Sequence, residues 1–267
     1  MIKVVFIGAG RMATAMVKGL LAKQYFSPEE IACTCGDGPT GSQLAKATGI
    51  QHESDLTQLF ATADTVILAC KPQQLEQLDP AIAEGVAGKL VISILAGISL
   101  AQLNSCFEKA RNLVRAMPNT PGQIGAGITA YATLNLTSTS DTQTVQKILN
   151  ALGVTLHLPE DQIDAVTAVS GSGPAYIFEF TAGLREAALN VGLPKEVANQ
   201  LALETVLGAA RLMKETFEDP ETLRDKVTSP GGTTAAALEK FKDADLRSII
   251  NAAVAAAKKR SIELSKI

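Results

Sequence analysis

Short apolar runs alternate with polar segments of helical spacing through the first part of the chain. The runs are rich in Val, Ile and Leu and end at glycine, proline or polar residues, which is typical of buried strands. The predicted strands cover residues 2–7, 31–35, 64–69, 90–95 and 113–116. Because a helix is expected between successive strands, the pattern predicts repeated β-α units and a mostly parallel, doubly wound α/β sheet.

The pattern changes after residue 158. From Glu160 onward only helical spacing remains, as in Ala182, Leu184, Ala187 and Val191, and alanine is frequent. We therefore predict an α/β domain over residues 1–158 and an all-α domain over residues 159–267. The helices offer few bulky side chains to bury, which favours a domain that dimerises through them; a self-contained alanine-rich bundle is the alternative.

A glycine-rich turn follows the first predicted strand. Gly8, Gly10 and Ala13 come between the run IKVVFI and an apolar helical pattern. In a Rossmann-like unit the first glycine makes the tight turn, the second lets the backbone reach a pyrophosphate at the helix N-terminus, and the third small residue packs helix on strand. This context favours a dinucleotide site over a glycine turn that serves only the fold.

Three further loops follow predicted strands. They contain Lys71 and Pro72, Ala96 and Gly97, and the segment 117–119. Ligands of parallel α/β sheets bind beyond the carboxyl ends of the strands. We therefore expect these loops and the first glycine turn to surround one crevice.

The second informative segment is VTSPGGTTAAAL, residues 227–238. Gly231 and Gly232 let the backbone approach a ligand, and Thr233 or Thr234 is suited to cap the following helix. A helix N-terminus attracts anions such as a carboxylate. A Pro-Gly turn that merely joins two helices is the alternative.

Composition narrows the class of protein. The 267 residues carry a formal charge of −3, with 19% charged residues and no basic block, so nothing favours nucleic acid or a membrane surface as a partner. The four cysteines have the spacing of neither a zinc site nor a redox pair, so we expect no metal. No secretion signal precedes the first strand and no apolar run is long enough to span a bilayer, so we expect a cytoplasmic protein.

Few residues are suited to acid–base chemistry. His52 and His157 are the two histidines, and neither lies in a glycine-rich motif. The segment SGSGPAY, residues 170–176, is a glycine-rich helix start, but it is not followed by the lysine that hydroxyacid dehydrogenases carry there. Close packing of the helix through its small residues, a structural role, is the alternative to a role in the active site. A reductase without an evident acid suits a cyclic imine, whose basic nitrogen can arrive protonated. Positioning and one threonine hydroxyl would then be sufficient.

Taken together, GAGRMA, ACKP, MPNTP, SGSGPAY and VTSPGGTTAAAL resemble the pyrroline-5-carboxylate reductases, in order and over essentially the whole chain. The resemblance implies reduction of 1-pyrroline-5-carboxylate to L-proline with NADPH or NADH, the last step of proline biosynthesis. It also implies a homodimer built from interleaved C-terminal helices, often assembled into a larger ring.

The resemblance also assigns residues. The pyrophosphate contacts would be Gly8, Ala9, Gly10 and Met12, with Ala13 in the third small position. The nicotinamide side would be lined by Ala69, Lys71, Pro72, Ala96, Gly97 and Asn119. The substrate carboxylate would lie on Ser229, Gly231, Gly232, Thr233 and Thr234. Thr234 would be the catalytic residue that faces the ring nitrogen, and Glu160 would lie near the substrate.

The chain departs from the family after the second predicted strand. Residues 33–39 contain no arginine for the 2′-phosphate of NADPH. Asp37 favours NADH, whereas Thr40, Gly41 and Ser42 offer groups for a phosphate, so both cofactors stay open. Two other hypotheses compete: another imine or hydroxyacid reductase of the same architecture, and a non-catalytic nucleotide sensor.

Overall fold

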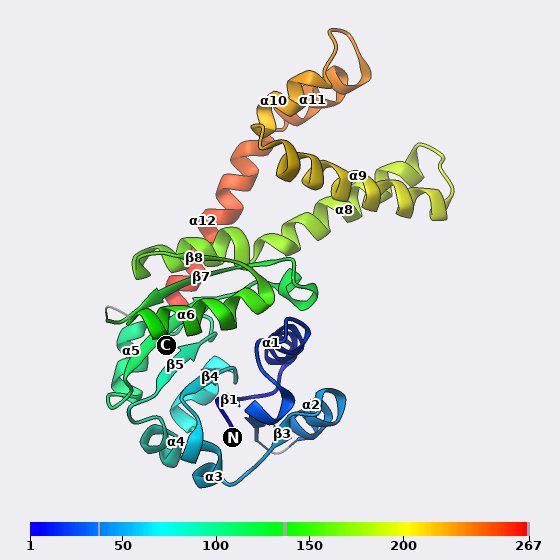
Figure 1. Ribbon diagram of the computed structural model, residues 1–267. Coiled ribbons are helices and arrows are strands. Elements are labelled where there is room, and N and C mark those ends of the chain that lie inside the picture. Colours follow the sequence, from blue (N-terminus) through cyan, green and yellow to red (C-terminus); the bar gives the residue numbers. More distant parts are fainter. Residues whose placement is uncertain (37, 136–137, 266–267) are drawn as a thin grey trace. The chain divides into compact units, whose positions relative to one another are not determined.

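The computed structural model describes residues 1–36, 38–135 and 138–265 (Figure 1). In this part of the chain, eight strands form one sheet in the order β3-β2-β1-β4-β5-β6-β7-β8. The strands are β1 (Val4–Ile7), β2 (Ile31–Thr34), β3 (Gln51–His52), β4 (Thr65–Leu68), β5 (Leu90–Ser93), β6 (Asn112–Met117), β7 (Gly127–Thr133) and β8 (Gly153–His157). The first six are parallel in the order of a dinucleotide-binding sheet, which confirms the predicted fold class.

The far edge of the sheet differs from a purely parallel arrangement. Strand β7 runs antiparallel to β6, and β8 runs parallel to β7. The sequence patterns predicted neither of these strands, nor the two-residue β3. The predicted parallel core is therefore correct but is three strands narrower than the observed sheet.

Helices cover both faces of the sheet. They are α1 (Arg11–Ala22), α2 (Thr40–Thr48), α3 (Leu56–Thr62), α4 (Pro80–Gly85), α5 (Leu100–Cys106), α6 (Thr139–Leu149) and α7 (Ile163–Val166). Alternate strand residues divide between two apolar clusters, because neighbouring side chains point to opposite faces. Phe6 packs with α1, α2 and α6 on one face, and Ile7 packs with α3, α4, α5 and α7 on the other.

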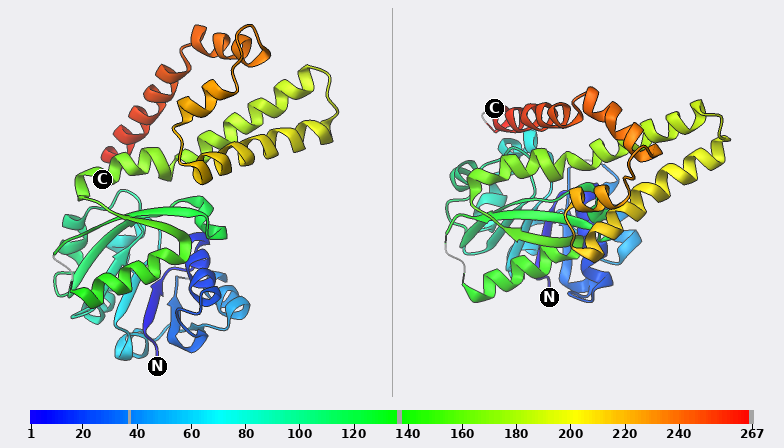
Figure 2. Two further views of the ribbon diagram at one scale, coloured as in Figure 1. Left: turned by 45° about the horizontal axis from the view of Figure 1, so that its top comes forward. Right: turned by 90° about the horizontal axis from the view of Figure 1, so that it is seen from above.

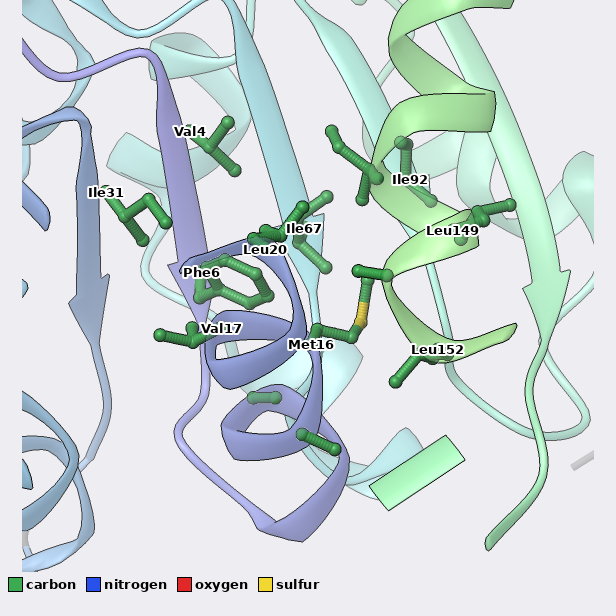
Figure 3. Packing of buried hydrophobic residues seen from close by; sticks show 14 of the residues in the cluster. Val4, Phe6, Met16, Val17, Leu20, Ile31, Ile67, Ile92, Leu149 and Leu152 are labelled. Atoms are coloured by element: carbon green, nitrogen blue, oxygen red, sulfur yellow. The ribbon is translucent and has the colours of Figure 1, made fainter. Parts of the chain in front are cut away.

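Helix α1 owes its position to one apolar stripe. Met16, Val17 and Leu20 are fully buried and gather around Phe6 and Ile67 (Figure 3). Each fully buried side chain of this size contributes roughly 1.5–3 kcal/mol of hydrophobic stabilisation. The stripe therefore fixes the start of α1, directly after Gly10, against the ends of the strands.

The chain divides into two compact units, Met1–Ser172 with Ala257–Ile267, and Gly173–Ala256. The first unit continues past residue 158 because Ile163 and Ala168 are buried against the sheet. The predicted boundary between residues 158 and 159 divides the chain by function and not by compactness, and it stays a prediction.

The second unit is helical. Its helices are α8 (Gly173–Asn190), α9 (Lys195–Thr216), α10 (Pro220–Lys226), α11 (Thr233–Asp243) and the first part of α12 (Leu246–Leu264). Helices α8 and α9 run side by side as a hairpin (Figure 2). None of the helices in the described ranges combines the length and the apolar character needed to cross a membrane.

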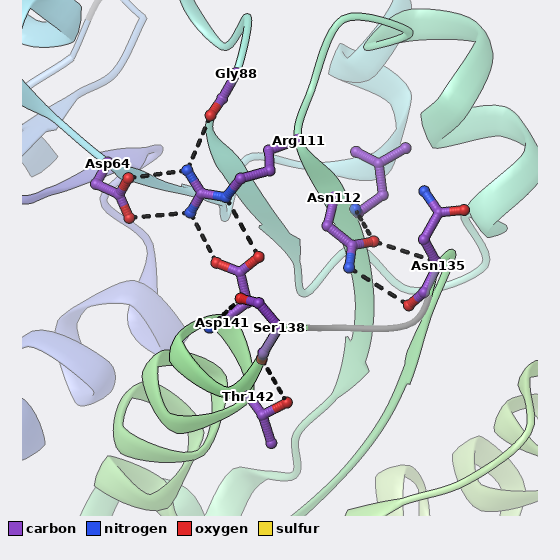
Figure 4. Close-up of polar contacts among 9 residues, drawn as sticks. Asp64, Gly88, Arg111, Asn112, Asn135, Ser138, Asp141 and Thr142 are labelled. Atoms are coloured by element: carbon purple, nitrogen blue, oxygen red, sulfur yellow. Dashed lines mark hydrogen bonds and ion pairs between the residues drawn. The ribbon is translucent and has the colours of Figure 1, made fainter.

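An arginine joins three segments where β6 begins. Arg111 donates to Asp64 at 2.9 Å, to Asp141 at 2.8 Å and to the carbonyl oxygen of Gly88 at 2.9 Å (Figure 4). Hydrogen bonds to Asp64 and then to Asp141 raise the pKa of the Arg111 guanidinium above its ordinary value. Asp141 lies in the first turn of α6, so the arginine links that helix to the β4 and β5 edges.

Candidate active site

Four loops meet at the carboxyl edge of the parallel strands. Strands β1, β4, β5 and β6 are neighbours in the sheet, and their ends lead into the segments 8–10, 69–72, 94–97 and 117–119. Parallel neighbours end at the same edge, so the loops predicted to surround a crevice do share one side of the sheet. This is the side on which α/β proteins bind nucleotides.

Gly8 makes the turn out of β1 under two constraints. Its φ is +108°, and an added Cβ would lie 2.6 Å from the carbonyl oxygen of Ala69. Its N–H donates to the Thr34 carbonyl oxygen at 2.7 Å. No other residue type satisfies both the backbone angle and the close approach without strain.

Gly10 has a different environment. It is exposed, and an added Cβ would meet no heavy atom within 4 Å. It is the N-cap residue of α1, and no side chain caps this 12-residue helix, so open space around Gly10 adjoins an uncapped helix N-terminus. Open space in front of an uncapped helix N-terminus fits a pyrophosphate.

The neighbouring alanines are part of the core. Ala9 and Ala13 are buried in the cluster that contains Phe6, whereas Met12 is half-buried. Any contribution of Ala9 to a ligand is therefore through its backbone, and Ala13 serves the close packing of α1 on the sheet.

The residues expected on the nicotinamide side occupy the other three loops. Ala69 is half-buried directly after β4, and Lys71 is exposed at the start of the 3₁₀ turn Pro72–Gln77. Ala96 is exposed and Gly97 is buried after β5. Asn119 is buried after β6, and its Oδ1 accepts a hydrogen bond of 3.0 Å from the Ile128 N–H.

The end of β2 contains two thiols. Cys33 is fully buried, and burial raises the pKa of its thiol from 9.0 to about 11. Cys35 is partly exposed, with its Sγ 3.8 Å from His52 Nε2. Asp37, the residue that would favour NADH, lies outside the described residues. Thr40 and Gly41 begin α2, and Ser42 Oγ donates to the Pro39 carbonyl oxygen at 3.0 Å.

The segment 229–234 belongs to the helical unit and forms a closed turn. Pro230 and Gly231 take the two central positions, and the Gly232 N–H donates to the Ser229 carbonyl oxygen at 3.0 Å. Gly231 has φ +71°, the left-handed value that glycine supplies at this position. Nothing lies within 4 Å of a Cβ added to Gly231, so the outer side of the turn is open.

Helix α11 begins immediately after this turn. Its N-cap is Gly232, so the expectation that Thr233 or Thr234 caps the helix is wrong: both lie one residue or more inside it. Within the described ranges, the Thr234 hydroxyl makes no hydrogen bond to another residue. A hydroxyl and uncapped N–H groups of this kind are suited to bind an anion or a polar ligand atom.

Glu160 lies in the first unit and is engaged by the protein. Its Oε1 accepts a hydrogen bond of 2.6 Å from the Leu100 N–H, at the start of α5. The same oxygen is 3.3 Å from Arg115 Nη1. The residue expected near the substrate thus supports the helix that follows the Ala96–Gly97 loop.

Sequence reasoning missed the partners of Glu160. Arg115, Asp164 and Ser261 form one partly buried polar network with it, and the buried Arg115 interrupts the apolar run of β6. A charged residue in a buried strand is the signal that points to such a network.

The segment SGSGPAY shows close packing at its start. Residues Thr167–Gly171 form a π-helical turn, and a Cβ on Gly171 would lie 2.8 Å from Cε of Met117. The small residue at 171 therefore permits the contact with the end of β6, as the packing interpretation predicts.

The histidines have structural surroundings. The His157 ring stacks on Tyr131 with 4.9 Å between centroids, and His52 ends the short strand β3. In the part of the chain that the structure describes, no three His, Cys, Asp or Glu side chains are grouped to hold a metal ion.

Two protein families match different parts of this chain. Residues 160–264 match the family "Pyrroline-5-carboxylate reductase dimerisation". Residues 3–97 match the family "NADP oxidoreductase coenzyme F420-dependent".

Individual proteins match over the full length. The pyrroline-5-carboxylate reductase of a Synechocystis strain is 41% identical over 97% of each chain. The solved reductase of Coxiella burnetii superposes with a TM-score of 0.92 at 37% identity, covering 99% of both chains. The solved pyrroline carboxylate reductase of Plasmodium falciparum, with NADP bound, superposes with a TM-score of 0.87 at 28% identity. The match covers 99% of this chain and 98% of the Plasmodium chain. With its sheet order, its glycine turn and its helical second half, the chain belongs to the pyrroline-5-carboxylate reductase family.

Proposed function

We propose that this protein reduces 1-pyrroline-5-carboxylate to L-proline with NADPH or NADH, the last step of proline biosynthesis. The observation that carries the proposal is the open, uncapped start of α11 behind the 229–232 turn. A nucleotide sensor has no need of this second anion site. The relatives named as pyrroline-5-carboxylate reductases support the same substrate.

The cofactor side of the proposal rests on α1. Its first N–H groups bind the pyrophosphate in the open space in front of Gly10, while Gly8 holds β1 against β4. Ala69, Lys71, Pro72, Ala96, Gly97 and Asn119 position the nicotinamide end. When bound, the reduced nicotinamide supplies a hydride to the imine carbon.

The substrate side rests on α11. Ser229, Gly231, Gly232 and Thr233 hold the carboxylate through N–H and hydroxyl groups, and the Thr234 hydroxyl contacts the ring nitrogen. The imine nitrogen takes its proton from solvent before it binds, so the reaction of imine, hydride and proton balances as the secondary amine. The chain then needs to position and stabilise charge rather than to supply a strong acid.

We also place the protein in the cytoplasm as a homodimer. Its helical unit leaves large apolar side chains uncovered, among them Ile177, Phe178, Leu201 and Leu203, each at least 49% exposed. A second copy that covers these helices would remove this apolar surface from water. The matched dimerisation family over residues 160–264 supports this assembly.

The decisive experiment is an assay of the purified full-length protein. NADPH or NADH oxidation should depend on added 1-pyrroline-5-carboxylate and should yield L-proline in equal amount. Lactate or 3-hydroxybutyrate with NAD should give no reduction. Cofactor oxidation that is unaffected by the imine, or reaction with the hydroxyacids, would overturn the proposal.

A further inference from the structure

A buried arginine stands in the strand that leads to Asn119. The Arg115 side chain on β6 is only 5% exposed. Its Nη2 lies 2.9 Å from Asp164 Oδ1, and its Nη1 lies 3.3 Å from Glu160 Oε1. A buried guanidinium is costly unless it is paired, so Arg115 holds both carboxylates of the segment after β8 in place.

The Glu160 carboxylate connects Arg115 to the loop after β5. Its Oε1 also accepts the 2.6 Å hydrogen bond from the Leu100 N–H, which lies 60 residues away in the chain. Leu100 is the first residue of α5 and directly follows the loop that contains Ala96 and Gly97. The loop after β5 is thus anchored at its far end by a side chain that Arg115 fixes.

The last turns of α12 contact both the polar network and the loop after β5. Ser261 is buried, and its Oγ donates to Asp164 Oδ1 at 2.8 Å. Leu264 lies against Gly97, where an added Cβ would be 3.2 Å from the Leu264 Cβ. All of these residues belong to the first compact unit. The end of the chain therefore contacts both the loop and the polar network that anchors it.

We propose that Glu160 is a positioning residue for the dinucleotide, not a substrate contact. Held by Arg115, it fixes the Leu100 amide and thereby sets the Ala96–Gly97 backbone against the nicotinamide. Ser261 completes the support through Asp164. This inference rests on the proposed function, because that function assigns the Ala96–Gly97 loop to the cofactor.

The test compares NADPH binding with substrate kinetics in the full-length protein. Fluorescence titration without substrate gives the Kd of NADPH for Glu160→Gln and Ser261→Ala. The matched controls are Asp161→Asn, the exposed neighbour of Glu160, and Ser265→Ala, directly after α12, whose hydroxyl donates to the carbonyl oxygen of Ile262 in that helix.

The expected result is a weaker NADPH complex in both variants. Loss of the ion pair in Glu160→Gln should raise the Kd about ten-fold, in line with a hydrogen bond to a charged group. Ser261→Ala should raise it about three-fold, in line with a hydrogen bond at the weaker end of the usual range. In the double variant, the rise in the Kd of NADPH should be smaller than the product of the two single rises, because both side chains belong to one network. The controls should match the wild type, and the KM for 1-pyrroline-5-carboxylate should be unchanged.

Two results would overturn the inference. An unchanged NADPH Kd with a raised KM for the imine in Glu160→Gln would show a direct substrate contact. A lower melting temperature with unchanged NADPH Kd in both variants would show a purely structural network. A wild type that binds NADPH but does not reduce the imine would refute the proposed function instead, and the NADPH titrations would still test the positioning role.

Discussion

Gly8 lies so close to Ala69 that the two backbones leave no room for a side chain: a Cβ on Gly8 would be 2.6 Å from the Ala69 carbonyl oxygen. Two residues later, at Gly10, the same addition meets nothing within 4 Å. Two glycines of one motif thus have separate physical roles. One joins the ends of β1 and β4, and the other leaves space in front of α1.

This contrast predicts opposite effects of substitution. Gly10→Val should weaken NADPH binding severely and leave the melting temperature near that of the wild type, because the side chain enters only the space kept for the pyrophosphate. Gly8→Ala should lower the free energy of unfolding by about 2 kcal/mol or more, since it combines a strained φ with a backbone clash. Fluorescence titration and thermal melts of both variants check this. An unchanged NADPH Kd in Gly10→Val would disprove the assigned pyrophosphate position.

The second prediction concerns Thr234. Thr234→Ala should lower turnover of 1-pyrroline-5-carboxylate ten-fold or more, about 1.4 kcal/mol of transition-state stabilisation, with NADPH affinity little changed. Thr234→Ser should retain most activity because it keeps the hydroxyl. Since Gly232, not Thr234, occupies the N-cap position of α11 and no side chain caps this helix, the alanine variant should not lose the roughly 1 kcal/mol that removal of a capping side chain costs.

The matched control for Thr234 is Thr228→Ala. The Thr228 hydroxyl donates to the Arg224 carbonyl oxygen at 2.6 Å at the end of α10, before the turn begins. This variant should turn over normally. Steady-state kinetics beside a thermal melt distinguishes the roles, and a Thr234→Ala protein that melts early but has a normal kcat would contradict the catalytic assignment.

The third prediction concerns Arg111. Arg111→Met should lower the free energy of unfolding by about 1–3 kcal/mol, because it leaves the buried Asp141 without its partner. The loss is smaller than for a fully buried pair because the Arg111 side chain is 36% exposed and its charge is partly screened by solvent. Lys3→Met, which breaks the more exposed pair with Glu30, should lower the free energy of unfolding by less than Arg111→Met does. Urea unfolding measures both, and equal losses would mean that the Arg111 cluster adds no special stability.

The fourth prediction concerns alkaline pH and Cys33. Burial raises the pKa of this thiol from 9.0 to about 11, so folding favours its neutral form. This stabilisation is fully present below pH 9, and it is lost as pH rises towards 11, where only the unfolded chain ionises readily. The loss is at most about 3 kcal/mol.

Comparison with Cys33→Ala isolates that effect. The variant should show a shallower fall in unfolding free energy between pH 9 and 11 than the wild type. Removal of Sγ also costs packing energy, but this shifts the whole curve without changing its slope. Identical slopes in the wild type and in Cys33→Ala would refute the role of the Cys33 thiol.

Much of the parallel sheet could be predicted because its strands are covered on both faces. Such strands appear as continuous apolar runs, as in VVFI of β1 and TVIL of β4. Strand β7 reads GITAYAT, with small residues among the larger ones, and β3 has only two residues, both exposed. Neither carries an apolar run, and pairing with neighbours determines both.

The candidate site was predictable to the extent that it is local. The glycine turn at Gly8 and the Pro230–Gly231 turn are encoded by adjacent residues whose backbone needs are known. The Arg115 network could not be predicted, because its members lie far apart in the sequence. Arg115 and Asp164 are separated by 49 residues, and Asp164 and Ser261 by 97. The N-cap of α11 was misassigned by one or two residues because glycine and threonine are about equally favoured at that position, so the residue types alone do not distinguish Gly232 from the threonines that follow it.

The division of α12 between both compact units makes the helical unit an insertion. A protein cut after Ser172 would lack Ser261, the buried partner of Asp164, so the dinucleotide-binding unit cannot be isolated by simple truncation. To isolate this unit, a linker would have to join Ser172 to the segment that begins at Ala257.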